Sequence, residues 1–344
     1  MNQPDRFFTR DIFKKSSLTQ ALHSLSKKEW YVFVILIGFL ILSTFAILWK
    51  INNQFLVEIP AYGGTVHEGI VGTPRFVNPV LALSDADRDI STLVYSGLMK
   101  KMPDGTFVPD MAESYTLSDD GLEYTFTLKE NLTFHDGQPL TANDVVFTIQ
   151  KIKDPIIKSP RRLNWEGVLV EKIDERTITF TLKRSFASFL DNTTVGIMPS
   201  HIWAELTPEE MSFSDLNSNA IGSGPFQISS IQKKSSGIPE SYELHAFKKY
   251  ANGRAYLNKI IVHFYPNEKE LSKAVSSDTV GHASGLSPAY SAELETKGFQ
   301  VANGVLPRIF GLYYNQTQAP VFTDRNVVRA IDTAIRKDAL VGEV

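Results

Sequence analysis

The chain has 344 residues, which at roughly 100–200 residues per domain predicts two or three domains. Its 35 Lys and Arg nearly balance 38 Asp and Glu, and the formal net charge of −3 excludes a polybasic nucleic-acid binder. The sequence contains no cysteine, which excludes disulfides, thiolate metal sites, a cysteine nucleophile and a lipid-modified cysteine anchor.

An uncharged stretch near the amino terminus predicts a membrane anchor. Residues 31–49 carry no charge, and as a helix they would span roughly 28 Å, close to the thickness of a bilayer's hydrocarbon core. Tyr31 and Trp49 stand at its ends, where aromatic rings prefer the headgroup zone. Residues 1–29 carry six Lys and Arg against three Asp and Glu, an excess that places the amino terminus in the cytoplasm.

We therefore expect a cytoplasmic tail over residues 1–29, a transmembrane helix over 30–49 and a tether over 50–62. A cleaved signal peptide is the alternative, although the apolar stretch is longer than usual and no small-residue cleavage site follows it. A buried core helix ranks last, because the stretch has no polar face.

Strands and helices are both predicted in the remainder. Apolar and polar residues alternate over 124–128 and again over 178–182, which is typical of strands. Thr141 and Asp144 form a helix-capping pattern before a helix that Pro155 ends. Residues 327–335 predict a second amphipathic helix behind Asp324. This mixture indicates an α/β or α+β protein.

The sequence offers no positive evidence for catalysis. Its seven histidines are scattered without metal-ligand spacing, and neither Gly222–Pro225 nor Gly281–Gly285 matches a nucleophile elbow or a phosphate loop. We expect no catalytic residues, no metal ligands and no cofactor. Asp136 and Asp144 are conspicuous carboxylates, but a turn and a helix cap explain them better than a site does.

Four segments in order resemble one family. They are residues 63–98, 107–155, 221–226 and 312–331, of which the second is the most specific, with PheValProAspMetAlaGluSer and LeuThrAlaAsnAspValValPhe. They are similar to the extracytoplasmic solute-binding proteins of peptide and nickel-type ABC importers, family 5. The resemblance implies an α/β, periplasmic-binding-protein-like (type II) fold of two lobes.

On that resemblance, residues 63–305 form lobe one, with a subdomain over about 96–190, and residues 306–344 form a crossing strand and the start of lobe two. Members of the family are usually considerably longer. We therefore expect a chain truncated at its carboxyl terminus, and a natural single-lobe protein is the alternative.

The family binds an extended ligand between its lobes, and the resemblance extends this to four places in the chain. Ligand contacts are expected from Leu83, Ser84 and Asp85, from Asn164 and Trp165, from His282, Ala283, Ser284 and Gly285, and from Tyr313. The loop at 81–85 is equally consistent with ordinary surface, residues 281–286 with a plain linker, and Trp165 with a core residue.

The resemblance implies a membrane-anchored binding protein without enzymatic activity. It would capture oligopeptides or a related small solute outside the cytoplasm and deliver them to an ABC permease, with residues 30–49 in the lipid bilayer and no nucleic-acid partner. One alternative is a ligand-sensing receptor of the same fold, although a cytoplasmic part of 29 residues is too short for a kinase or a cyclase. From another class, an extracytoplasmic hydrolase would need a catalytic constellation in a cleft.

Overall fold

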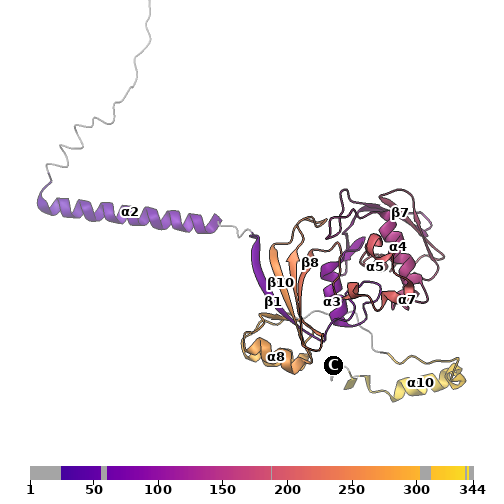
Figure 1. Cartoon of the computed structure of the whole chain (residues 1–344). Helices are drawn as coiled ribbons and strands as arrows, with labels where there is room; N and C mark the ends of the chain where they lie inside the picture. Colours follow the sequence, from indigo (N-terminus) through magenta and orange to yellow (C-terminus); the bar gives the residue numbers. More distant parts are fainter. Residues whose placement is uncertain (1–24, 56–59, 187, 303–310, 338, 341–344) are drawn as a thin grey trace, which may run out of the picture. The chain divides into compact units, whose positions relative to one another are not determined.

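The chain divides into two compact units. The computed structural model describes residues 25–55, 60–186, 188–302, 311–337 and 339–340. The first unit comprises Met1–Glu68 and Gly72–Phe264, and the second comprises Gly69–Val71 and Tyr265–Val344 (Figure 1). This division falls at Tyr265, and the lobe boundary expected at residues 305 and 306 stays a prediction.

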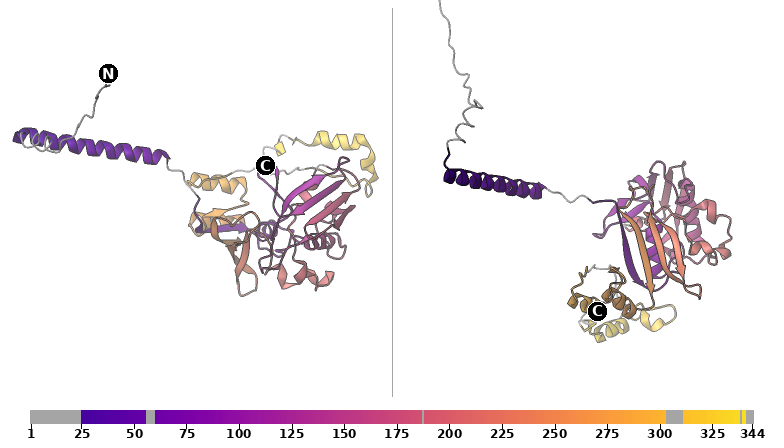
Figure 2. Two further views of the ribbon diagram at one scale, coloured as in Figure 1. Left: turned by 90° about the horizontal axis from the view of Figure 1, so that it is seen from above. Right: turned by 60° about the vertical axis from the view of Figure 1, so that its left-hand side comes forward.

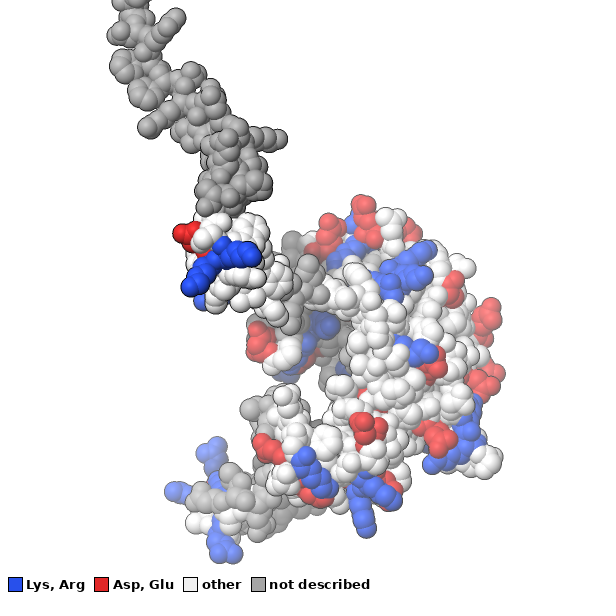
Figure 3. All heavy atoms as spheres, turned by 90° about the vertical axis from the view of Figure 1, so that its left-hand side faces the viewer, with Lys and Arg blue, Asp and Glu red and all other residues white. Residues whose placement is uncertain are grey.

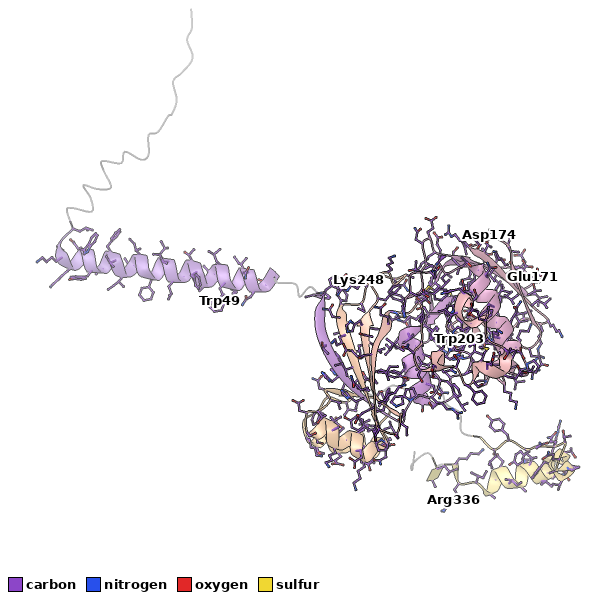
Figure 4. All side chains as sticks on the ribbon, in the orientation of Figure 1. Trp49, Glu171, Asp174, Trp203, Lys248 and Arg336 are labelled. Atoms are coloured by element: carbon purple, nitrogen blue, oxygen red, sulfur yellow. The ribbon has the colours of Figure 1, made fainter. Side chains whose placement is uncertain are left out.

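The predicted membrane segment is a helix, α2 (Lys27–Phe55), which is longer than expected at both ends. Residues 50–55, expected in the tether, continue the helix, because neither proline nor glycine interrupts it before Pro60. By length and composition α2 is able to cross a membrane, and none of its most apolar stretch is buried, which contradicts the core-helix alternative. Figure 4 labels Trp49 on this helix. The predicted tail over 1–29 lies mostly outside the described residues.

The first unit contains a sheet built from long strands distant in sequence. It has the order β1 (Gly63–Val71), β10 (Leu257–Tyr265), β9 (Pro239–Ala246), β8 (Phe226–Lys233), and its strands lie side by side in Figure 2. β9 pairs with β8 and with β10 in antiparallel register. Tyr242 faces Val262 across β9 and β10, and both side chains are buried. Helix α3 (Asp85–Val94) contacts β8.

A second sheet of the same unit confirms the predicted alternating strands. Its antiparallel order is β4 (Ala112–Leu117), β5 (Glu123–Leu128), β7 (Thr177–Leu182), β6 (Val168–Lys172). Phe126 of β5 lies opposite Ile178 of β7, and both are fully buried. The two runs of alternating residues therefore pair with each other and present one apolar face to the core.

Helix α4 (Ala142–Lys153) packs on this sheet and confirms the capping pattern. The backbone N–H of Thr141 donates to Asp144 Oδ2 over 2.8 Å, and Ser200 N–H donates to Asp144 Oδ1 over 2.9 Å. Val145 and Ile149 are buried, and each contributes about 2 kcal/mol by leaving water. The capping role predicted for Asp144 is confirmed.

Short elements connect these sheets: β2 (Met99–Lys101), β3 (Phe107–Pro109), η1 (Arg162–Trp165), α5 (Phe189–Asn192), α6 (Ser200–Trp203), α7 (Pro208–Met211) and η2 (Asp215–Asn217). They close the core around Trp203, which Figure 4 labels and which is 1% exposed.

The second unit has a small core of its own. It contains α8 (Glu268–Ser276), β11 (His282–Ala283) and α9 (Pro288–Thr296), and β11 pairs with the end of β1. Leu271 and Leu294 belong to its buried cluster. The predicted last helix is confirmed as α10 (Arg325–Ala334), which Asp324 caps and which follows η3 (Pro320–Thr323). Residues 311–315 form no strand, so the described part of the predicted crossing strand is irregular chain, and residues 303–310 lie outside the description.

The segment Gly222-Ser223-Gly224 contacts the end of helix α3 on one side and His135 on the other. Gly224 N–H donates to Val94 O at the end of α3 over 2.8 Å, and a Cβ on Gly222 would lie 2.1 Å from the same oxygen. No side chain fits there without displacing backbone. On the other side, His135 N–H donates to Gly222 O over 2.8 Å. We call this arrangement the glycine clasp.

The His135 imidazole completes the glycine clasp in its neutral form. Gly222 N–H donates to Nδ1 over 3.3 Å, and Nε2 lies 3.1 Å from Gly224 O, a contact that requires the proton on Nε2. Burial lowers the pKa of His135 to about 4, although the hydrogen bond to Gly224 and the charge of Asp136 oppose that shift. A protonated ring would have no acceptor left for Gly222.

This geometry predicts a pH dependence of stability. Because the pKa of His135 is about 4 in the fold and near 6.5 in an unfolded chain, the unfolded state holds more protons between these values, so stability falls as the pH falls through this window. Thermal unfolding of the full chain in detergent micelles, from pH 7 to pH 4, measures the slope. His135→Gln should flatten it while lowering stability at pH 7. His282→Gln, which removes an exposed histidine, should leave the slope unchanged; equal slopes in all three proteins would contradict the assignment.

Candidate functional site

The first unit is hollowed beside helix α3. A cavity of about 330 Å³, which we call the α3 pocket, is lined by Arg88, Ser91, Tyr95, Lys100, Asp110 and Arg161, among others. The volume lies at the lower end of the range for small-molecule sites. Helix α3 supplies one wall of this pocket, and the glycine clasp fixes the last turn of that helix. Pro225, which follows the clasp in sequence, also lines the pocket.

Asp110 is the buried carboxylate of the α3 pocket. Its side chain accepts hydrogen bonds from Tyr250 Oη over 2.9 Å and from Asn252 Nδ2 over 2.7 Å. Burial raises the pKa of Asp110, and the donated hydrogen bonds and two nearby lysines limit the shift. Burial, together with this carboxylate, raises the pKa of Tyr250 to about 12, so Tyr250 stays a hydrogen-bond donor at neutral pH.

The hydroxyl of Ser91, which lines the α3 pocket, is buried without a hydrogen-bond partner among the described residues. Burial raises the pKa of Tyr95, although a hydrogen bond with Trp203 opposes that shift, so the Tyr95 hydroxyl remains protonated. A buried hydroxyl without a partner costs free energy, and a bound polar molecule or water would relieve that cost.

A wider groove adjoins the α3 pocket and shares Arg161 and Thr194 with it. This groove, about 1040 Å³ in volume, is also lined by Asn164, and we call it the Asn164 groove. Burial lowers the pKa of the Arg161 guanidinium and repulsion from Arg88 lowers it further, while the carboxylate of Asp191 opposes both. A half-buried guanidinium between two hollows is suited to hold a carboxylate or a carbonyl oxygen of a solute.

The predicted contacts at 83–85 lie at the start of α3 rather than in a loop. Ser84 caps the helix: its hydroxyl accepts from Asp87 N–H over 3.1 Å, and Asp87 Oδ2 accepts from Ser84 N–H over 3.0 Å. Burial acts to raise the pKa of Asp87, but four backbone N–H donors outweigh it and the pKa is lowered. Asp85 is paired with Arg88. The cap therefore occupies the hydroxyl of Ser84, and the ion pair occupies the carboxylate of Asp85. Of the three predicted contacts, Leu83 is the residue whose side chain is accessible, being 66% exposed.

The structure separates the second predicted pair. Asn164 lines the Asn164 groove, and its backbone carbonyl accepts from Asn192 Nδ2 over 2.8 Å. Trp165 is 1% exposed and packs against Phe180 and Phe189. Its indole therefore acts as a core residue, the alternative that the sequence left open.

The remaining predicted residues belong to the second unit. His282 and Ala283 form β11, Ser284 N–H donates to Gly69 O over 3.2 Å, and Gly285 has a positive φ of 76° with open space beside it. Tyr313 is 87% exposed. The N–H of Ser284 is therefore engaged within the unit, whereas the side chains of His282, Ser284 and Tyr313 are exposed to solvent.

None of the predicted site residues lines the α3 pocket. Asp110 lies within the most specific of the family-like segments, which could have drawn attention to it, but its partners Tyr250 and Asn252 are about 140 residues away. Arg161 stands in a connection without periodicity. Only the fold brings these groups together.

The described residues hold no group of three His, Cys, Asp or Glu side chains placed to bind a metal ion. On the face shown in Figure 3, basic and acidic side chains are interspersed. Such a surface does not provide the basic stripe that nucleic acids require.

Comparison with known families gives a match over most of the chain. The model of the bacterial extracellular solute-binding proteins, family 5 (middle region), matches residues 106–344. The oligopeptide-binding protein AppA of Bacillus subtilis is 26% identical over 289 residues, covering 83% of this chain and 52% of AppA. The chain thus spans about half the length of this relative.

Solved structures show the same fold. The ABC transporter substrate-binding protein CtaP of Listeria monocytogenes matches with a TM-score of 0.60 and 32% identity, over 68% of this chain and 47% of CtaP. AppA in complex with a nonapeptide matches with a TM-score of 0.60 and 29% identity, over 64% of this chain and 44% of AppA. The predicted α/β fold of the type II periplasmic-binding-protein class is confirmed.

Proposed function

This chain belongs to family 5 of the bacterial extracellular solute-binding proteins, and we propose that it captures oligopeptides, or a related small solute, for an ABC importer. The observation that supports this most strongly is the family match over residues 106–344, together with the likeness to AppA, whose structure holds a nonapeptide. In this proposal the chain performs no chemistry, and a permease elsewhere in the membrane receives the solute.

We place the ligand contacts where the chain is accessible. Residues 283–285 have small side chains, and Ser284 and Gly285 are exposed, which lets a peptide approach the main chain closely. Leu83, Asn164 and Tyr313 add accessible side-chain atoms. Such recognition tolerates many different peptide side chains, because hydrogen bonds to the peptide's main chain supply most of the affinity.

The proposal also covers the lobes and the membrane. Residues 63–305 would form lobe one and residues 306–344 the start of lobe two, so that closure of two lobes holds the solute. Helix α2 would keep the lobes at the outer face of the membrane. Its apolar side chains are exposed over the whole predicted span, and in water such a surface would be costly.

Two alternatives predict different behaviour. A receptor of the same fold would bind the solute and pass a signal through α2. A hydrolase would return the peptide in pieces. The relatives described above are named as binding proteins, which favours capture.

Capture is tested by equilibrium dialysis of the full chain, in detergent micelles, against a mixture of oligopeptides, with mass spectrometry of the retained fraction. In this proposal residues 306–344 form only the start of lobe two, so we expect retention to be weak and the retained peptides to be intact. Ser284→Trp, which places a bulky ring on the accessible segment 282–285, should weaken retention at least about ten-fold, equivalent to 1.4 kcal/mol. Ser235→Trp, at an exposed turn between β8 and β9, is the matched control and should change nothing.

Three outcomes of the dialysis would contradict this proposal. Shortened peptides would indicate a hydrolase. Equal retention by Ser284→Trp and Ser235→Trp would remove the segment 282–285 from the site. The absence of retention would contradict capture by this chain.

The orientation in the membrane is tested by labelling. Because the chain has no cysteine, a single introduced cysteine is a unique reporter. In intact cells a membrane-impermeant maleimide should label Ser235→Cys at once, and Ser17→Cys only after lysis. Labelling in the reverse order would place the lobes in the cytoplasm and contradict the proposal.

A further inference from the structure

Two histidines distant in sequence meet on the first sheet. His67 lies on β1 and His263 on the neighbouring β10, strands that run side by side in Figure 1. Nδ1 of His67 lies 3.1 Å from Nε2 of His263, and the rings stack with their centroids 5.4 Å apart and an interplanar angle of 13°. His67 is exposed and His263 half-buried, so the pair is open to solvent.

Ring nitrogens this close carry at most one proton between them, and a metal ion bound to both would displace that proton. Two N–H groups cannot face each other at hydrogen-bond distance, so at least one of the two nitrogens is unprotonated. Neutral imidazole is the form that binds metal ions.

The separation of the two nitrogens suits one metal ion. With metal–nitrogen bonds of about 2.1 Å, nitrogens 3.1 Å apart subtend an angle of about 95° at the ion. That angle is close to the right angle between neighbouring ligands in square-planar and octahedral complexes, the geometry of Cu²⁺ and Ni²⁺, and smaller than the tetrahedral angle that Zn²⁺ favours.

Neighbouring polar side chains on the sheet are engaged with one another. Glu243 of β9 accepts from His245 over 2.8 Å and from Lys259 over 2.6 Å. Ser241 lies opposite His263 in the register of β9 and β10. Since the described residues bring no third His, Cys, Asp or Glu to the pair, water would fill the remaining positions around an ion.

We propose that His67 and His263 form a two-histidine site for Cu²⁺ or Ni²⁺. The bound ion joins β1 to β10 through side chains, in addition to the backbone pairing of the sheet. It therefore fixes the strand that follows α2 and the tether. The site lies on one unit and does not depend on the solute proposed above.

The test uses the full chain in detergent micelles and the metal alone. Calorimetric titrations with CuCl₂ and with NiCl₂ should show one more ion bound to the wild type than to His67→Gln or His263→Gln, or an affinity at least about ten-fold higher. The melting temperature should rise with metal in the wild type and not in these two variants, because an ion that binds only the folded state stabilises it. Electron paramagnetic resonance of the Cu²⁺ form should show coupling to two imidazole nitrogens.

His282→Gln and His245→Gln are the matched controls. Each removes one imidazole from the surface and should retain the full metal response. Circular dichroism without metal tests whether the four variants are folded. If either site variant is unfolded, the coupling of Cu²⁺ to two imidazole nitrogens in the wild type decides. Absence of metal binding by the wild type, or an equal response in His67→Gln and the controls, would overturn the proposal.

Discussion

The close approach of Gly222 and Gly224 to the end of α3 is the contact on which the first unit depends. It fixes the last turn of α3, which lies against the sheet of β8, to a segment that His135 holds from the other side. Because a Cβ at Gly222 would overlap Val94 O, this junction requires glycine. The α3 pocket is lined by Tyr95 after the end of α3 and by Pro225 after the two glycines, so its shape depends on this backbone contact.

Local patterns predicted much of the fold, and the structure shows why. The strands at 124–128 and 178–182 have one buried face. Alternation of apolar and polar residues is a good predictor of strands in a sheet that packs on the core with one face only. The helix α4 has its cap, Thr141, and its breaker, Pro155, next to it in the sequence. The limits of α2 were less predictable, since the apolar stretch defines only the candidate membrane span while the polar flanks continue the helix.

The candidate site could not be predicted in the same way, because its groups come together only in three dimensions. Asp110 meets Tyr250 and Asn252 across about 140 residues, and His67 meets His263 across 196. No spacing rule covers such pairs. Trp165 shows the converse: an aromatic residue in a long connection is consistent with a ligand contact or a core position, and only its burial decides. The family-like motifs predicted the fold class correctly because they are themselves runs of local structure.

Taken together, a family of extracellular binding proteins, an exposed apolar helix and an accessible segment at residues 282–285 support the proposal of solute capture at the membrane surface. Uptake of a radiolabelled oligopeptide by the cell that encodes this chain tests that account most directly. Deletion of the gene should abolish uptake, and the restored gene should recover it with the peptide arriving intact. Unchanged uptake after deletion, measured over a range of peptide lengths, would contradict the account.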